Sequence, residues 1–148
     1  MNKGIRKRAR GIVFIDGKMV SMYREFQGRI FYAIPGGGME EGETEEECVK
    51  REVFEEFGIV VKPIKKVYIY QNEKSDEHFY LCDYVSGEFG SGQGEEFQPN
   101  RNRGIYIPSL LSVEDIPNLP LMPPEIAKAI VEDYKLNGQS LSDFVKKV

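Results

Sequence analysis

Apolar residues recur along the first part of the chain in short β-rich runs separated by turn residues. The run Ala9 to Ile15 ends at Asp16-Gly17, and apolar residues resume over Met19 to Tyr23. This pattern is typical of a hairpin with a tight primed turn. A further short strand is expected over Ile30 to Ile34. The segment Pro35-Gly36-Gly37-Gly38 suits neither a helix nor a strand, so we expect a loop to begin there.

A helix is predicted directly after this loop. Thr44 and Glu47 form a capping-box signature, and the glutamates between them suit the positive end of the helix dipole. Gly58 is typical of a left-handed C-terminal cap, which places the helix from Thr44 to Phe57. Its apolar stripe is expected to dock on a sheet and comprises Val49, Val53 and Phe57.

The remaining pattern alternates β-rich runs with polar segments. Strands are expected over Val60 to Tyr70, His78 to Val85, and Gly104 to Ile107. Pro63 predicts an edge or a bulge in the first of these, and Ser86 to Asn102 is predicted to be a long loop. Helical segments are expected over Val113 to Ile116, Pro124 to Leu136 and Leu141 to Val148.

Composition narrows the class of protein. The length of 148 residues suits one domain spanning 1–148, and 41% hydrophobic with 30% charged residues is typical of a globular chain. There is no apolar stretch long enough for a membrane span and no signal-peptide core, so we expect a cytoplasmic protein. Cys48 and Cys82 lack CxxC spacing, and we expect them to be reduced and packed.

The charge is unevenly distributed. The net charge of −4 argues against general nucleic-acid binding. The basic run Arg6 to Arg10 has two interpretations, a phosphate contact or a solvated edge strand, and we favour the edge strand. An acidic block lies between Glu40 and Glu56.

The acidic block carries the candidate chemistry. At about 100° per residue, Glu52, Glu55 and Glu56 fall within an arc of roughly 100° on one face of the predicted helix. Their mutual repulsion would raise their pKa values, and a bound cation removes this cost. All-oxygen ligands suit Mg²⁺, with Mn²⁺ as a substitute. The alternative is a solvated charged face, which usually carries interleaved basic residues, and here only Lys50 and Arg51 interrupt the run.

The glycines before the helix add a second feature. A glycine-rich loop that leads into a helix lets the backbone approach a phosphate or metal closely. The chain reads Gly37, five residues, Glu43, seven residues, and then Arg51-Glu52-Val53-Phe54-Glu55-Glu56-Phe57-Gly58-Ile59. This segment of 23 residues resembles the complete Nudix box, and the strand and helix order around it is similar to the family's α/β/α sandwich. The fold class expected is therefore α/β (α+β), with a mixed central sheet.

The resemblance implies roles for individual residues. Divalent cations would be bound by Glu52, Glu55, Glu56 and the backbone carbonyl of Gly36. Arg51 and Glu43 would form a charge-assisted pair that pins the loop to the helix. The alternative for this pair is two independent surface charges.

The general base stays open at this point. Within the box, either Glu52 or Glu55 is a candidate. The Gly90 to Phe97 loop offers a candidate outside the box in Glu95 or Glu96, because its position is similar to where some relatives keep a further glutamate, and we favour Glu95. The alternative is that both are solvated loop residues.

Other residues carry weaker expectations. Candidate substrate-binding residues are Arg24, Tyr32, Gly37 and Gly38. For Arg24 and Tyr32, packing within the protein is an equal alternative. The only histidine, His78, is expected to be a strand residue near the site and not a ligand or base.

The function implied is divalent-metal-dependent hydrolysis of a phosphoanhydride bond in a nucleoside diphosphate linked to another moiety. The substrate would be a small nucleotide: a nucleoside triphosphate, a nucleotide sugar or a dinucleotide. The alternative is a non-catalytic nucleotide-sensing module on the same fold. An RNA-end hydrolase is disfavoured by the negative charge. No interface pattern decides whether the chain forms a homodimer.

Overall fold

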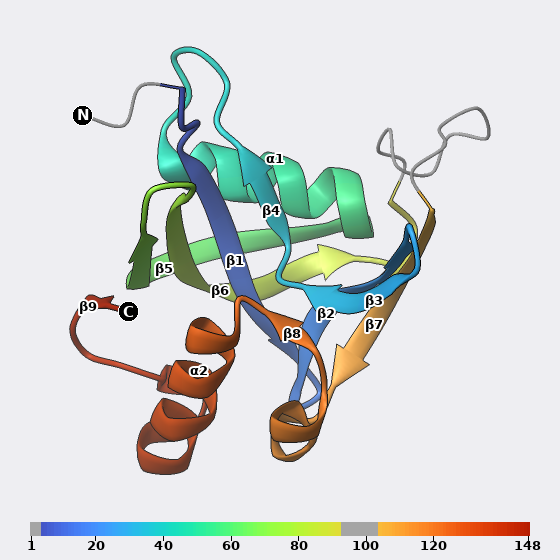
Figure 1. The fold of residues 1–148 in the computed structure, drawn as a ribbon, viewed down its shortest axis with the longest axis vertical. Helices are drawn as coiled ribbons and strands as arrows, with labels where there is room; N and C mark the ends of the chain where they lie inside the picture. Colours follow the sequence, from blue (N-terminus) through green and yellow to red (C-terminus); the bar gives the residue numbers. More distant parts are fainter. Residues whose placement is uncertain (1–3, 93–103) are drawn as a thin grey trace.

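The computed structural model describes residues 4–92 and 104–148 (Figure 1). The strands in chain order are β1 (Arg8–Ile15), β2 (Lys18–Phe26), β3 (Arg29–Ala33), β4 (Gly36–Gly38), β5 (Ile59–Gln71), β6 (Asp76–Gly87), β7 (Ile105–Leu111), β8 (Leu121–Met122) and β9 (Lys146–Lys147). The α-helices are α1 (Glu45–Phe57) and α2 (Pro124–Asn137), and the 3-10 helices are η2 (Val113–Asn118) and η3 (Gly138–Ser140).

The strands form a mixed sheet that curls around β1. Their order is β8-β3-β2-β1-β6-β5-β9, with β4 paired to β1 and β7 paired to β2. Strand β1 runs parallel to β6 and antiparallel to β2 and β4. Its start, Arg8 to Arg10, pairs with β4, whereas its end, Phe14 and Ile15, pairs with β2. One strand therefore links the hairpin β2–β3 to the glycine segment.

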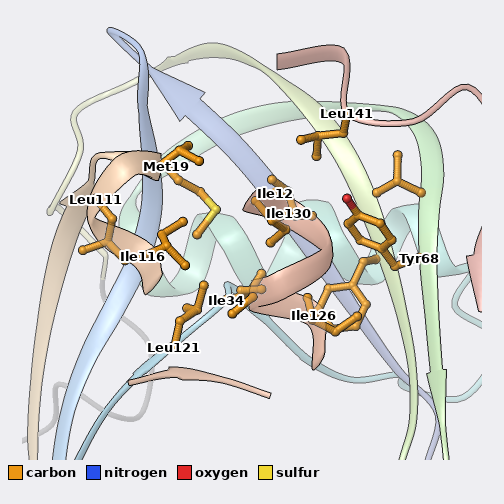
Figure 2. Packing of buried hydrophobic residues seen from close by; sticks show 14 residues of the cluster. Ile12, Met19, Ile34, Tyr68, Leu111, Ile116, Leu121, Ile126, Ile130 and Leu141 are labelled. Atoms are coloured by element: carbon orange, nitrogen blue, oxygen red, sulfur yellow. The ribbon is translucent and has the colours of Figure 1, made fainter. Parts of the chain in front are cut away.

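A helix covers each face of this sheet (Figure 1). Because successive strand residues point to opposite faces, Val13 packs with the buried face of α1 and Ile12 packs with α2. In Figure 2, Ile12 and Ile34 lie on the sheet side of one cluster and face Ile126 and Ile130 of α2. These two apolar clusters confirm the expected α/β sandwich with a mixed sheet.

The predictions that depend on residues close together in the chain are confirmed. Asp16 and Gly17 both have positive φ (51° and 80°), as a primed hairpin turn requires. Thr44 caps α1 in a reciprocal capping box, and Gly58 ends the helix at φ 75°. Pro63 lies at a register shift between β5 and β6, as a bulge-forming proline should.

Three expectations were wrong, and each failed because of a distant partner. Gly36 to Gly38 is a short strand and not a loop, because β1 supplies backbone partners on one side. The basic run does not form a solvated edge strand, since β1 has paired neighbours on both sides. Leu141 to Val148 is not helical: Lys146 and Lys147 pair with the edge of β5 instead.

Both cysteines are free and buried. Burial raises the pKa of the Cys48 thiol to about 11 and that of Cys82 to about 12, so both stay protonated at neutral pH. This confirms the expectation of packed, reduced thiols.

Among the described residues, neither α-helix combines the length and apolar character needed to cross a bilayer.

Candidate active site

Arg51 joins the glycine segment to α1. Its Nε donates to Glu43 Oε2 at 2.7 Å and its Nη2 donates to Glu43 Oε1 at 3.0 Å, a bidentate pair. The same Nη2 donates to the Gly38 carbonyl at 3.2 Å. Glu43 Oε1 also accepts from the Glu40 backbone N–H at 3.0 Å. The expected Arg51–Glu43 pair is therefore present and attaches the turn before α1 to the middle of the helix.

Each member of this pair stabilises the ionised form of the other. Hydrogen bonding from Arg51 lowers the pKa of Glu43 to about 2, and the same bonds raise the pKa of Arg51. The side chain of Glu43 is only 12% exposed, so solvent screens the pair weakly. Both groups are ionised across the physiological pH range.

Arg51 also contacts two of the three helix carboxylates. Its Nη1 lies 3.0 Å from Glu52 Oε1 and 3.5 Å from Glu55 Oε2. The side chain of Glu55 is 47% exposed, whereas that of Glu52 is 19% exposed. One partly buried guanidinium thus offsets part of the repulsion in the acidic cluster.

Glycines bring the backbone against the other sides of these carboxylates. A Cβ on Gly37 would lie 2.6 Å from Glu52 Oε1, so only glycine leaves room for that carboxylate. The Gly36 N–H donates to Glu56 Oε1 at 2.9 Å. The acidic face of α1 and strand β4 therefore form one compact unit.

The chemistry of the donor set fits a hard divalent cation. The set consists of carboxylate oxygens in a cradle beside Gly37 that any Cβ would fill. In the described part of the chain, however, no three Asp, Glu, His or Cys side chains converge on one point. Glu52 and Glu55 turn toward Arg51, and Glu56 turns toward Gly36.

The structure does not bring all predicted substrate residues together. Gly37 and Gly38 are buried, and their carbonyls accept from Cys48 Sγ and Arg51 respectively.

Arg24 lies on the sheet face covered by α1, because it pairs with Tyr106 of the α1-side cluster. Tyr32 packs in the α2-side cluster, on the opposite face. The side chains of directly paired residues on neighbouring strands point to the same face of a sheet. Arg24 pairs with Phe31, so Tyr32, the next residue, points to the opposite face.

Glu95 and Glu96 lie outside the described residues. His78 is a buried strand residue, as expected, with Nε2 2.8 Å from Asp76 and Nδ1 3.1 Å from Lys66 Nζ. Lys66 also bonds Glu45 at 2.7 Å.

This polar group at the start of α1 was missed by the sequence reasoning, which assigned Glu45 only to the helix dipole. Burial opposes ionisation of Glu45, but hydrogen bonds from Lys66 and Tyr80 lower its pKa to about 2. No local signal links these residues, because they come from β5, β6 and α1.

Arg6, the first residue of the basic run, donates from Nε and Nη2 to the Met39 carbonyl at 3.0 and 2.9 Å. Arg10 likewise bonds inward, to Glu77 and to the Ile34 carbonyl. The basic run thus braces the chain on either side of β4.

The chain is similar in sequence to known proteins. The chain is 33% identical over 91 residues to an ADP-ribose pyrophosphatase of Methanocaldococcus jannaschii, covering 55% of this chain and 53% of that protein. It is 31% identical over 103 residues to an 8-oxo-dGTP diphosphatase of Haemophilus influenzae, covering 65% of this chain and 76% of that protein. The match thus spans about half the length of the first relative and three quarters of the second.

The fold is similar to solved structures as well. A crystal structure of a NUDIX hydrolase from Nitrosomonas europaea matches with a TM-score of 0.72 at 13% identity, covering 100% of this chain and 81% of that one. At this identity the likeness concerns the fold alone. The model of the NUDIX domain matches residues 5–132, which include β4, α1 and the whole carboxylate cluster. The chain therefore belongs to the Nudix hydrolase family.

Proposed function

We propose that the chain hydrolyses a phosphoanhydride bond in a nucleoside diphosphate linked to another moiety, with Mg²⁺ as its cofactor and Mn²⁺ as a substitute. The substrate is a nucleoside triphosphate, a nucleotide sugar or a dinucleotide. The observation that carries this proposal is the Arg51-braced set of carboxylates packed against the glycine strand. Relatives named as a pyrophosphatase and a diphosphatase support the same bond type.

Glu52, Glu55 and Glu56 would hold the metal, together with the Gly36 carbonyl. A divalent ion would supply charge neutralisation at the phosphate oxygens when bound. Arg51 would hold the carboxylates in place through its contacts to Glu43 and Glu52.

Glu55 is our preferred proton acceptor for the attacking water. It is the more exposed of the two candidates within the box, and its contact to Arg51 is longer than that of Glu52. A base must reach a water molecule beside the substrate, and exposure favours this. Glu95 remains the candidate outside the box.

The test is a screen of nucleoside triphosphates, nucleotide sugars and dinucleoside polyphosphates with Mg²⁺, comparing wild type with Glu55→Gln. The variant should lose at least about 100-fold in kcat, within the range that general-base groups contribute. Glu46→Gln is the matched control, since Glu46 lies exposed in the first turn of the same helix.

Full activity of Glu55→Gln would refute its assignment. Nucleotide binding by the wild type without turnover of any substrate would favour the sensing module instead.

A further inference from the structure

An arginine and two aromatic rings lie side by side on the α1 face of the sheet. Arg24 of β2 pairs with Phe31 of β3 on one side and with Tyr106 of β7 on the other. Its guanidinium carbon lies 3.6 Å from the Tyr106 ring centroid and 5.5 Å from that of Phe31. Figure 1 shows these three strands next to one another. We call Phe31, Arg24 and Tyr106 the stacking row.

The stacking row lines an open pocket of about 400 Å³. The rest of its lining is Phe26, Gln27 and Arg29. Arg29 also lies over Phe31, with its guanidinium carbon 5.6 Å from the ring centroid. Aromatic rings with a few polar groups at this volume are typical of small-molecule sites.

The pocket faces the same side of the sheet as the carboxylate cluster. On that face the next cross-strand pair after Arg24 and Phe31 is Met22 and Ala33, whose side chains pack in the α1-side cluster. Phe31 precedes Gly36 by five residues, which is at most about 18 Å of extended chain. Gly36 in turn bonds Glu56. A ligand with phosphates at β4 can therefore extend along this face toward the stacking row.

We propose that the stacking row binds the base of the nucleoside whose diphosphate is cleaved; this rests on the proposed function. A flat base can stack on an aromatic ring or on the plane of a guanidinium, and both surfaces are present here. Two arginines alone would also suit a phosphate, but three aromatic side chains in one pocket favour a planar ring. Tyr106 and Phe31 are therefore specificity-determining residues.

The test compares Tyr106→Leu with Tyr106→Phe, which keeps the ring. With the best nucleotide substrate, Tyr106→Leu should raise KM about tenfold or more, because stacking of one base contributes that much. Its kcat should stay within about twofold, since the ring does not touch the reacting atoms. Tyr106→Phe should restore the wild-type KM. The KM for the same sugar phosphate without its base should not respond to either variant.

Tyr23→Leu is the matched control. Tyr23 directly precedes Arg24 but makes an edge-to-face contact with Tyr32 on the opposite face, so its loss should leave KM unchanged. If Tyr106→Leu does not fold, Phe31→Leu takes its place with the same expectations. An unchanged KM in a folded variant, or an equal rise for the base-free compound, would overturn the proposal.

Binding without catalysis separates this proposal from the proposed function. Titration calorimetry with nucleoside monophosphates, which have no anhydride bond, should show weaker binding to Tyr106→Leu than to wild type. That result supports the stacking row even if no substrate is hydrolysed. Equal binding to both proteins refutes it even if hydrolysis is found.

Discussion

At the scale of single residues, Arg51 does the most to organise the site. It bonds both oxygens of Glu43, the Gly38 carbonyl and Glu52, and so connects the turn, the strand and the helix. A guanidinium suits this role because its donors lie in one plane and it stays charged. A lysine carries its three donors on one nitrogen, so it would not reproduce the bidentate pair with Glu43.

The depressed pKa of Glu43 predicts a pH-dependent stability. Its pKa is about 2 in the folded chain against an ordinary 4.5, so the ionised pair stabilises the fold above pH about 5 and this contribution is lost as pH falls toward 2. Glu43→Gln should lower the free energy of unfolding at pH 7 by about 1–2 kcal/mol. Urea titrations in EDTA should show that this difference shrinks as the pH is lowered from 5 to 3.

The control for this experiment is Glu41→Gln, since Glu41 is exposed. A constant difference between wild type and Glu43→Gln at every pH would show that the ionised pair is not the source of the stability.

At the scale of elements, β4 and α1 act as one unit. The strand pairs with β1 through Gly36 to Gly38, and the acidic face of α1 lies directly against it. Caps at Thr44 and Gly58 define both ends of the helix, and its apolar stripe sets its rotation on the sheet. The direction in which Glu52 points therefore follows from packing on the other side of the helix.

Two neighbouring glycines of β4 should respond differently to alanine. The three atoms nearest to a Cβ at Gly37 all belong to the flexible carboxylate of Glu52, so Gly37→Ala should cost less than about 1 kcal/mol of stability. It should nevertheless weaken Mn²⁺ binding about tenfold or more, because Glu52 must move. Urea unfolding and Mn²⁺ titration calorimetry measure the two effects.

Gly36→Ala provides the comparison. Gly36 has φ 144°, and a Cβ there would lie 2.4 Å from the Ala9 backbone oxygen, so this variant should lose about 2 kcal/mol or more of stability. Mn²⁺ binding to Gly37→Ala equal to that of wild type would contradict a role for Glu52 in holding the ion.

At the scale of the whole molecule, the core does not depend on the site. One apolar cluster lies between the sheet and α1, and the other between the sheet and α2. Among the residues that the structure describes, no carboxylate of the α1 acidic face belongs to either cluster. The large buried side chains that hold the two layers together are aliphatic, aromatic and methionine side chains.

Removing the metal should therefore stop turnover and leave the fold intact. With EDTA, hydrolysis in the screen should fall to background, while the far-UV circular dichroism spectrum stays that of the untreated protein. Adding Mg²⁺ in excess should restore the activity. Loss of the spectrum on chelation would show that the ion is structural.

The amino-acid sequence by itself determined the features that depend on residues close in the chain. The α1 caps, the primed turn at Asp16-Gly17 and the shared face of Glu52, Glu55 and Glu56 all follow from short-range geometry. The 23-residue motif likewise identified the family, because its spacing is carried by consecutive residues that run from β4 through one turn and α1. The α/β class followed from the order of these patterns.

Only the tertiary structure decided what depends on distant partners. Three glycines with no strand propensity form β4 because the backbone of β1 pairs with them. The basic run turned inward to Met39 and Glu77, and the C-terminal segment paired with β5 instead of coiling. The stacking row belongs here too, since register between β2, β3 and β7 sets which side chains meet. Such contacts join residues far apart in sequence, and their energies appear only once the sheet has formed.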